Sequence, residues 1–301
     1  MLLTLLRPGG FVPWRDLVFR AALSALHEEP IVWPRFGLVG PTCTGSHSDM
    51  NYHLLRCGAE PVAHYAADAF ELGRKAMGTP QEFARLRQQG ISAECDMLAA
   101  TGGINTHKGS IFLLGLLSFA LGHVLQYNTN LSVANLLAWA TAQSRSALIA
   151  DLVEKSRSSE ESYGEWAFRK YGLLGVRGHA INGFGDLYRV LHWLSSFPDV
   201  PIRALYGHLR LFFLSRCDDT NMVKRAGLSR TLDFRQSAIE ALSAGSMFHK
   251  DGFLRIQRLE GRMQQARVSA AASGDMMILV IFFERLGQYG FLNWKGHPEG
   301  A

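Results

Sequence analysis

Apolar residues in this chain recur at the three- and four-residue spacing of amphipathic helices, and period-two alternation never extends beyond a few residues. Helix-start signals such as Pro80 with Glu82 and Ser159 with Glu160 support this pattern. The predicted helices cover residues 14–28, 50–57, 61–78, 80–99, 110–126, 132–150, 159–171, 186–196, 201–216, 232–244, 251–272 and 273–288. We therefore expect an all-α fold: a single large multi-helix domain whose active site is built from interhelical loops.

The composition supports a folded domain with a substantial core. The chain has 301 residues, of which 48% are hydrophobic and 19% are charged. No repeat, low-complexity tract or long linker divides it. We expect an N-terminal helical segment over 1–30, an all-helical catalytic domain over 31–290 and a tail over 291–301.

Charge and cysteine usage narrow the class of protein. The net charge of +5 suits an anionic ligand, but no Lys/Arg block appears, so we expect no nucleic-acid partner. Cys43, Cys57, Cys95 and Cys217 form no zinc-type spacing and are predicted to be buried reduced thiols. The first residues make a poor signal peptide. The apolar stretches 111–121 and 276–283 are shorter than the roughly 20 residues of a membrane span. These features predict a cytoplasmic protein without a membrane partner.

The densest polar motif is Thr-Gly-Gly-Ile-Asn-Thr-His-Lys-Gly-Ser over residues 101–110, between two predicted helices. Its Gly pair permits unusual backbone conformations, and free N–H groups at the next helix start can face an anion. Lys108 adds a positive charge, and His107 adds a group that can move protons. A phosphate-rich ligand is the expected guest.

Two other interpretations of this run are a Walker A loop and a plain linker. A Walker A loop requires Gly before the Lys and a preceding strand, whereas His107 occupies that position here and the preceding residues look helical. A plain Gly-rich linker between helices is the simpler alternative. The concentration of hydrogen-bonding side chains within ten residues favours a binding function.

Further motifs follow in a fixed order along the chain. They are Gly-Ser-His-Ser-Asp-Met over 45–50, Gly-Val-Arg-Gly-His-Ala over 175–180, Asp-Thr-Asn-Met-Val-Lys-Arg over 219–225 and Ser-Gly-Asp over 273–275. With these motifs and the block over 94–112, the chain resembles the triphosphoribosyl-dephospho-coenzyme A synthase family (CitG or MdcB type) over roughly residues 31–285.

The resemblance implies a reaction. ATP would be joined to 3′-dephospho-coenzyme A through a new ribosyl–ribose bond, with loss of adenine. The product would be the prosthetic-group precursor of the acyl carrier subunit of citrate lyase or malonate decarboxylase, and it would pass to a holo-acyl-carrier-protein synthase. ATP as substrate and Mg²⁺ are therefore expected, and a homodimer is among the assemblies considered.

Cleaving an N-glycosidic bond builds positive charge on ribose, requires deprotonation of the attacking hydroxyl and leaves a triphosphate to be neutralised. The motif side chains suit these tasks. The predicted catalytic residues are His47, Asp49, His107 and Asp275; the nucleotide-binding residues are Gly102, Gly103, Asn105, Thr106, Lys108, Ser110, Asn221 and Arg225; the metal ligands are Asp96 and Asp219.

Each carboxylate also has a structural interpretation. Asp49 and Asp275 could be helix N-caps. Asp96 could be a solvated helix residue, and Asp219 could belong to a salt-bridged turn with Asn221 and Arg225. These alternatives stay open at this point.

The chain departs from the family pattern at several positions. His179 and Ile181 replace two glutamates, and Gly40-Pro41 replaces an Asp-Arg pair. Three alanines over 270–272 replace Pro-Gly-Gly, which predicts a longer helix through that junction. If the lost glutamates bound metal, metal binding should weaken. A non-catalytic nucleotide-binding relative and a ribosyltransferase with another acceptor therefore remain alternatives.

Overall fold

The computed structural model describes residues 6–7, 10–127, 132–155, 162–194 and 200–291. Its helices are α1 Trp14–Glu28, α2 Tyr52–Gly73, α3 Pro80–Ala100, α4 Lys108–Tyr127, α5 Val133–Lys155, α6 Tyr163–Tyr171, α7 Val176–Ile181, α8 Gly185–Leu194, α9 Ile202–Arg216, α10 Thr220–Ser243, α11 Lys250–Gln265 and α12 Ala271–Gln288. Short 3-10 turns cover Glu29–Ile31 (η1) and Ser246–Phe248 (η2), and a two-residue hairpin pairs Leu6–Arg7 (β1) with Gly10–Phe11 (β2). The all-α prediction is confirmed.

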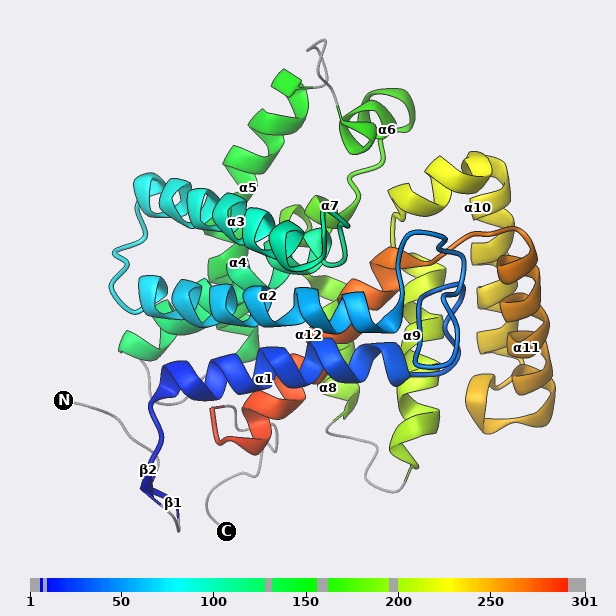
Figure 1. Ribbon diagram of the computed structural model, residues 1–301, viewed down its shortest axis with the longest axis horizontal. Helices are drawn as coiled ribbons and strands as arrows, with labels where there is room; N and C mark the ends of the chain where they lie inside the picture. The colour runs from blue at the N-terminus through cyan, green and yellow to red at the C-terminus, as the bar shows by residue number, and fades with distance from the viewer. Residues whose placement is uncertain (1–5, 8–9, 128–131, 156–161, 195–199, 292–301) are drawn as a thin grey trace.

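The core forms around α2, α4 and α12 (Figure 1). α2 packs against α1, α3 and α4, while α12 packs against α1, α4 and α9. Because α1 contributes to this same core, the N-terminal helix belongs to the main body of the fold. α10 and α11 pack against each other, and α10 also packs on α9; these helices share a second, smaller core with Phe36 and Val268.

α4 is the most apolar of the described helices, and it extends beyond the apolar stretch 111–121 at both ends. It has the length and hydropathy of a membrane span, but 78% of its most apolar window is buried inside the fold. Gly73 and Gly122 allow α2 and α4 to approach closely, since a Cβ at Gly122 would lie 2.1 Å from the Phe70 carbonyl oxygen. α4 therefore behaves as a central core helix.

Several predicted boundaries were wrong. One continuous α2 replaces the two helices predicted over 50–57 and 61–78, because Pro61 is accommodated inside the helix. α10 begins at Thr220 rather than 232, with non-helical backbone at Gly227. The longer helix expected through 270–272 does not form: α11 ends at Gln265, and Arg267 has a φ of 52° in the connection to α12. α7 lies between the helices predicted over 159–171 and 186–196, where no helix was predicted.

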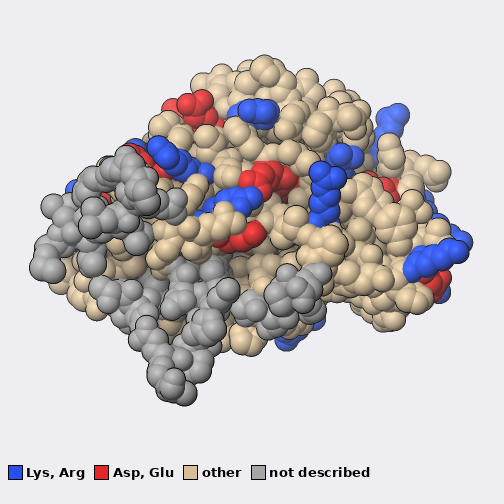
Figure 2. Space-filling view, turned by 90° about the horizontal axis from the view of Figure 1, so that it is seen from below, with Lys and Arg blue, Asp and Glu red and all other residues tan. Residues whose placement is uncertain are grey.

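Other predictions concern cysteines, charge and helix starts. Only Cys217 is buried; Cys43 and Cys95 are exposed and Cys57 is half-buried, so the expectation of four buried thiols was wrong. Basic and acidic side chains are interspersed on the face drawn in Figure 2. α6 begins after the capping residue Ser162, while residues 156–161, which include the predicted start at Ser159, lie outside the described part of the chain.

Candidate active site

Most predicted site residues line one cleft of about 900 Å³ between the core helices and α10. Its walls come from α3, α4, α5, the segment before α2, and the starts of α10 and α12. The predicted residues that line it are His47, Asp49, Asn105, Thr106, His107, Lys108, Ser110, Asp219, Asn221, Arg225 and Asp275. Gly102, Gly103 and Asp96 do not line it.

The starts of three helices converge at the floor of this cleft. Asp219 caps α10 by accepting a hydrogen bond from the Met222 N–H at 2.9 Å, and it also accepts one from the Ala272 N–H at the start of α12 at 2.8 Å. Asp275 of α12 accepts a hydrogen bond from the Ser110 hydroxyl of α4 at 2.5 Å. Helix N-termini carry partial positive charge, so this convergence favours negatively charged groups and ligands.

Asp275 is the most perturbed acid of the cleft. Its pKa is raised to about 7, mainly by burial; the Ser110 hydrogen bond opposes this rise, and the nearby carboxylates of Asp219 and Glu29 contribute to it. It lies beyond the first turn of α12, whose N-cap is Ala270, so the capping interpretation was wrong. Gly109 makes room for it: a Cβ there would lie 2.2 Å from Asp275 Oδ2. A carboxyl poised near neutral pH is suited to proton transfer.

Asp219 is also buried, and burial raises its pKa to about 6, while the N–H groups of Met222 and Ala272 oppose that rise. Each of its carboxylate oxygens already accepts one backbone hydrogen bond. Asp219 therefore caps α10 and connects it to α12, and it does not form the salt-bridged turn that was considered. Its role is to hold these two helix starts together and to add negative charge to the cleft floor.

His107 is buried behind the cleft surface. Burial, followed by the charge of His27, lowers its pKa to about 4, so the ring is neutral at neutral pH. Its Nδ1 lies 2.9 Å from Thr106 Oγ1, and its backbone N–H points at Met97 Sδ, 3.2 Å away. The ring is thus suited to hydrogen bonding and unsuited to supplying a proton at pH 7.

The rest of the glycine-rich run is arranged around the start of α4. Asn105 Oδ1 accepts a hydrogen bond from the Lys108 N–H at 3.1 Å. Lys108 Nζ lies 2.6 Å from Glu94 Oε1, which gives this lysine a carboxylate partner. Gly102 and Gly103 have φ of 64° and 88° and turn the chain from α3 into α4. They shape the connection from outside the cleft.

The segment before α2 carries His47 to the cleft. Arg225 of α10 donates to the Ser46 carbonyl at 2.9 Å, and its guanidinium lies 3.3 Å from His47 Nδ1. Burial, and then the charge of Arg225, lowers the pKa of His47, whereas Asp49 raises it. Asp49 Oδ1 lies 3.8 Å from His47 Nδ1. Asn51, rather than Asp49, caps α2.

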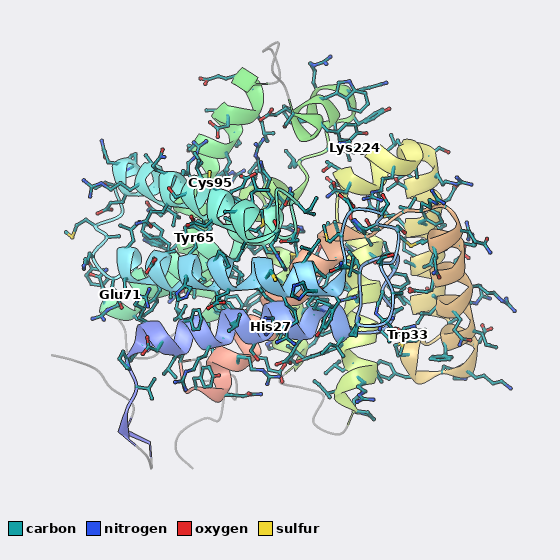
Figure 3. All side chains as sticks on the ribbon, viewed as in Figure 1. His27, Trp33, Tyr65, Glu71, Cys95 and Lys224 are labelled. Atoms are coloured by element: carbon teal, nitrogen blue, oxygen red, sulfur yellow. The ribbon has the colours of Figure 1, made fainter. Side chains whose placement is uncertain are left out.

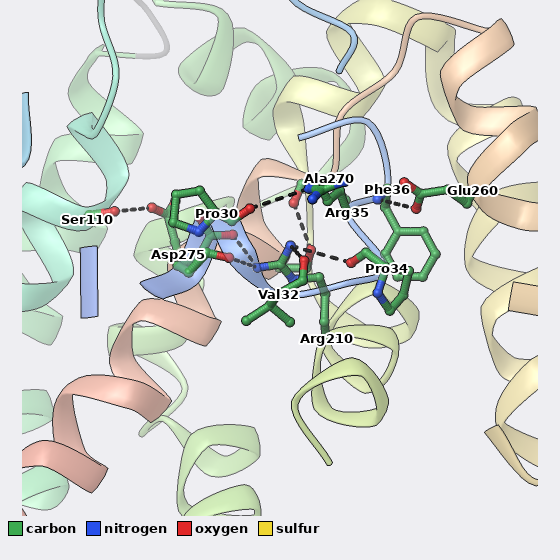
Figure 4. A network of polar contacts seen from close by, with 12 residues as sticks. Pro30, Val32, Pro34, Arg35, Phe36, Ser110, Arg210, Glu260, Ala270 and Asp275 are labelled. Atoms are coloured by element: carbon green, nitrogen blue, oxygen red, sulfur yellow. Dashed lines mark hydrogen bonds and ion pairs between the residues drawn. The ribbon is translucent and has the colours of Figure 1, made fainter. Parts of the chain in front are cut away.

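A buried arginine fixes this segment from behind. Arg210 of α9 is fully buried, pairs with the Glu29 carboxylate and donates to the carbonyls of Glu29, Val32 and Pro34 (Figure 4). Glu29 in turn lines the cleft. Arg210 therefore connects the wall of the cleft to the core beneath it.

The two predicted metal ligands do not share a site. Asp96 is exposed and lines a separate hollow between α2 and α3, whereas Asp219 is buried and fully hydrogen-bonded. Among the described residues, no group of three or more His, Cys, Asp and Glu side chains is placed to hold a metal ion. Asp96 and Asp219 therefore do not fit a resident Mg²⁺ ion.

Of the positions that depart from the family pattern, Ala271 and Ala272 line the cleft, whereas His179, Ile181, Gly40 and Pro41 do not. His179 faces Asp186 and Asp218, and Ile181 is buried in the main core. Val176 and Arg177, on the same short helix, do line the cleft.

Comparison with known proteins now places this geometry in a family. The model of the CitG family, described as ATP:dephospho-CoA triphosphoribosyl transferase, matches residues 16–292. The chain belongs to this family. It is 31% identical over 281 residues to protein CitXG of Leuconostoc mesenteroides subsp. cremoris, covering 89% of this chain and 59% of that longer relative. The resemblance stated from the motifs is confirmed.

Two further relatives cover most of both chains. The probable 2-(5''-triphosphoribosyl)-3'-dephosphocoenzyme-A synthase of Vibrio cholerae is 30% identical over 269 residues, or 87% of this chain and 85% of its own. The synthase of Escherichia fergusonii is 28% identical over 276 residues, or 89% and 88%. No solved structure matches the chain with significance.

Sequence reasoning missed several cleft residues of this CitG-family chain. Arg87, Asp151, Arg177 and Lys224 line the cleft, and Glu29 borders it from η1. Arg177 and Lys224 stand inside quoted motifs, which was the available signal. Arg87 and Asp151 lie on α3 and α5, and their ion pair becomes visible only in the fold.

Proposed function

We propose that this protein transfers the 5-triphosphoribosyl group of ATP to 3′-dephospho-coenzyme A and releases adenine. The observation that carries the proposal is the half-buried hydrogen bond between Asp275 and Ser110 at the floor of a cleft that also presents cationic side chains, in a chain of the CitG family. Both substrates carry phosphates, and both must place a ribose at one reaction centre.

In this proposal, Asp275 accepts the proton of the attacking ribose hydroxyl. The hydroxyl oxygen forms a bond to C1′ of the ATP ribose while the bond from C1′ to adenine breaks, and the departing adenine takes up one proton, so protons balance overall. A pKa of about 7 gives Asp275 both a substantial basic fraction and useful proton affinity at neutral pH. Ser110 holds the carboxylate in place through its hydrogen bond.

Positive charge builds on the ribose as adenine leaves. The carboxyl of Asp275 and the buried carboxyl of Asp219 lie near each other, as the effect of Asp219 on the pKa of Asp275 indicates, and their negative charge would stabilise that cation. Burial strengthens this effect because water screens it less. Mg²⁺ bound to ATP would enter as part of the substrate.

Cationic side chains flank this floor on two sides. Arg87 and Lys108 come from α3 and α4, whereas Lys224 and Arg225 come from α10. Two phosphate-bearing substrates require two such regions, one for each polyanion. The cleft therefore supports a two-substrate transfer.

The experiment combines purified protein, ATP, Mg²⁺ and dephospho-coenzyme A and measures free adenine by chromatography, with mass spectrometry of the acceptor. We expect adenine release that depends on the acceptor and a triphosphoribosylated product in equal amount. Adenine release with a different acceptor alone would favour the related ribosyltransferase. Tight ATP binding without turnover would favour a non-catalytic relative.

The positions of His179 and Ile181, where the chain departs from the family pattern, favour a catalytic protein over a non-catalytic relative. His179 and Ile181 do not line the cleft, so the lost glutamates remove no carboxylate from it.

We further propose that the protein works in the cytoplasm and that its product supplies the acyl carrier subunit of citrate lyase or malonate decarboxylase. Incubating the product with each apo-subunit and a holo-acyl-carrier-protein synthase would identify the recipient.

A further inference from the structure

Two neighbouring cations at the start of α10 differ from the other cations of the cleft. Lys224 and Arg225 both line it, and neither forms an ion pair with a carboxylate among the described residues. Lys108 is neutralised by Glu94 at 2.6 Å, and Arg177 lies 3.3 Å from Glu165. Among the described residues, the cationic side chains of the cleft without an ion-pair partner are therefore the two of α10, and the charge of Arg225 also acts on the buried Asp219.

The carboxylates nearest to this region have other partners. Asp218 lies 3.5 Å from Arg235, and Asp49 faces His47 at 3.8 Å. Asp219 is buried beneath backbone N–H groups. A polyanion entering beside α10 would consequently meet two cations without first displacing a carboxylate from them.

Both cations are also oriented. Arg225 is held by the Ser46 carbonyl and by His47. Lys224 Nζ lies 5.7 Å from the centre of the Tyr163 ring of α6, a favourable cation–π distance, and Figure 3 shows Lys224 close to α6 at the start of α10. Gly227, with φ 78° and ψ 165°, breaks the helix just after them and separates the short first segment of α10 from the rest.

The geometry points to the start of α10 as the subsite for the triphosphate of the ribosyl donor, with Lys224 and Arg225 as its binding residues and Tyr163 as the residue that positions Lys224. This inference rests on the proposed function. Charged hydrogen bonds to phosphate are strong, and an arginine beside a lysine offers both planar and point-charge recognition. Lys108, already paired with Glu94, is left for the acceptor side of the cleft.

The test uses inorganic tripolyphosphate as the probe and measures its binding by calorimetry. Lys224→Ala and Arg225→Ala are each expected to weaken binding about 10-fold or more, and Lys224→Arg should recover most of the loss. Lys108→Ala, and the matched surface control Lys250→Ala, should change binding by no more than about 2-fold. No measurable binding to the wild type, or a larger loss in Lys108→Ala than in Lys224→Ala, would overturn the assignment.

The positioning role of Tyr163 has its own readout. Tyr163→Phe keeps the ring and should bind tripolyphosphate as the wild type does, whereas Tyr163→Ala should bind several-fold more weakly. Equal effects of the two changes would contradict the cation–π contact. Urea unfolding of every variant shows whether the fold is retained.

Failure of this inference can be told apart from failure of the proposed function. If the wild type binds tripolyphosphate through α10 but releases no adenine, the subsite stands and the transferase proposal fails. If the wild type releases adenine and the KM for ATP is the same in Lys224→Ala, the transferase proposal stands and the subsite fails.

Discussion

Replacing Asp275 by Asn should abolish the base while keeping the shape of the side chain. Asn still accepts the Ser110 hydrogen bond through its amide oxygen, so the contact between α4 and α12 is retained. Loss of a positioned general base typically costs 10²–10⁴-fold in rate, and we expect a fall in kcat of about that size. Because the wild-type carboxyl must be ionised to act, its kcat/KM should rise with pH through about 7, whereas the residual activity of the variant should not show that rise.

The same substitution should stabilise the protein at high pH. The pKa of Asp275 is raised from 3.8 to about 7 by folding, so the stability associated with the protonated acid is complete below pH 3.8 and is lost as pH rises to about 7. At about 1.4 kcal/mol for each pKa unit, ionising this group costs the folded state about 4 kcal/mol at pH 8. Asn cannot ionise, so D275N should gain about 4 kcal/mol over the wild type at pH 8 and under about 1 kcal/mol at pH 4.

Urea unfolding at both pH values measures this gain directly, with adenine release measured on the same preparations. Asp251→Asn, which alters an exposed carboxylate on α11, is the control and should show no such pH-dependent gain. An equal gain for D275N at pH 4 and pH 8 would refute the raised pKa. Unchanged kcat in D275N would refute its role as the base even if the stability result holds.

Three further changes test other parts of the site. Lys108→Ala should raise the KM for dephospho-coenzyme A more than the KM for ATP, because Lys108 is assigned to the acceptor side; steady-state kinetics with the reverse order would contradict this. Gly109→Ala should lower kcat at least about 10-fold with the helical circular dichroism retained, because its Cβ would lie 2.2 Å from Asp275 Oδ2 and displace the carboxyl. Arg210→Ala should lower the unfolding free energy by about 3–5 kcal/mol in urea titration by leaving Glu29 buried without its partner, and Glu29→Gln in the same chain should recover part of that loss.

The helical architecture could be predicted from sequence because it depends on local periodicity. α1 was predicted with its correct bounds, and α3 to within one residue, since apolar spacing and the start signal of Pro80 with Glu82 are local. The errors came from tertiary effects. Pro61 was expected to mark a helix start but lies within α2, which packs against three neighbouring helices. The connection between α11 and α12 resists helix formation despite its alanines, because the Ala270 N–H bonds to the Phe36 carbonyl and the Ser46 hydroxyl bonds to the Val268 carbonyl.

The site residues were recognisable as motifs, but their chemistry depends on contacts between distant parts of the chain. Ser110 and Asp275 are separated by 165 residues and meet only because α4 and α12 cross at the cleft floor. Two acids that both lie near helix starts therefore have different roles. Asp219 accepts hydrogen bonds through both carboxylate oxygens and so joins two helices, whereas Asp275 accepts the Ser110 hydrogen bond through one oxygen and has the other available. Asp96, adjacent to the most specific motif, lies on the opposite side of α3 from the cleft, because successive helix positions point in different directions. The motifs therefore identify the residues of the site. The packing of α4, α10 and α12 around Asp275 decides which of these residues can transfer a proton, which can bind phosphate and which only cap a helix.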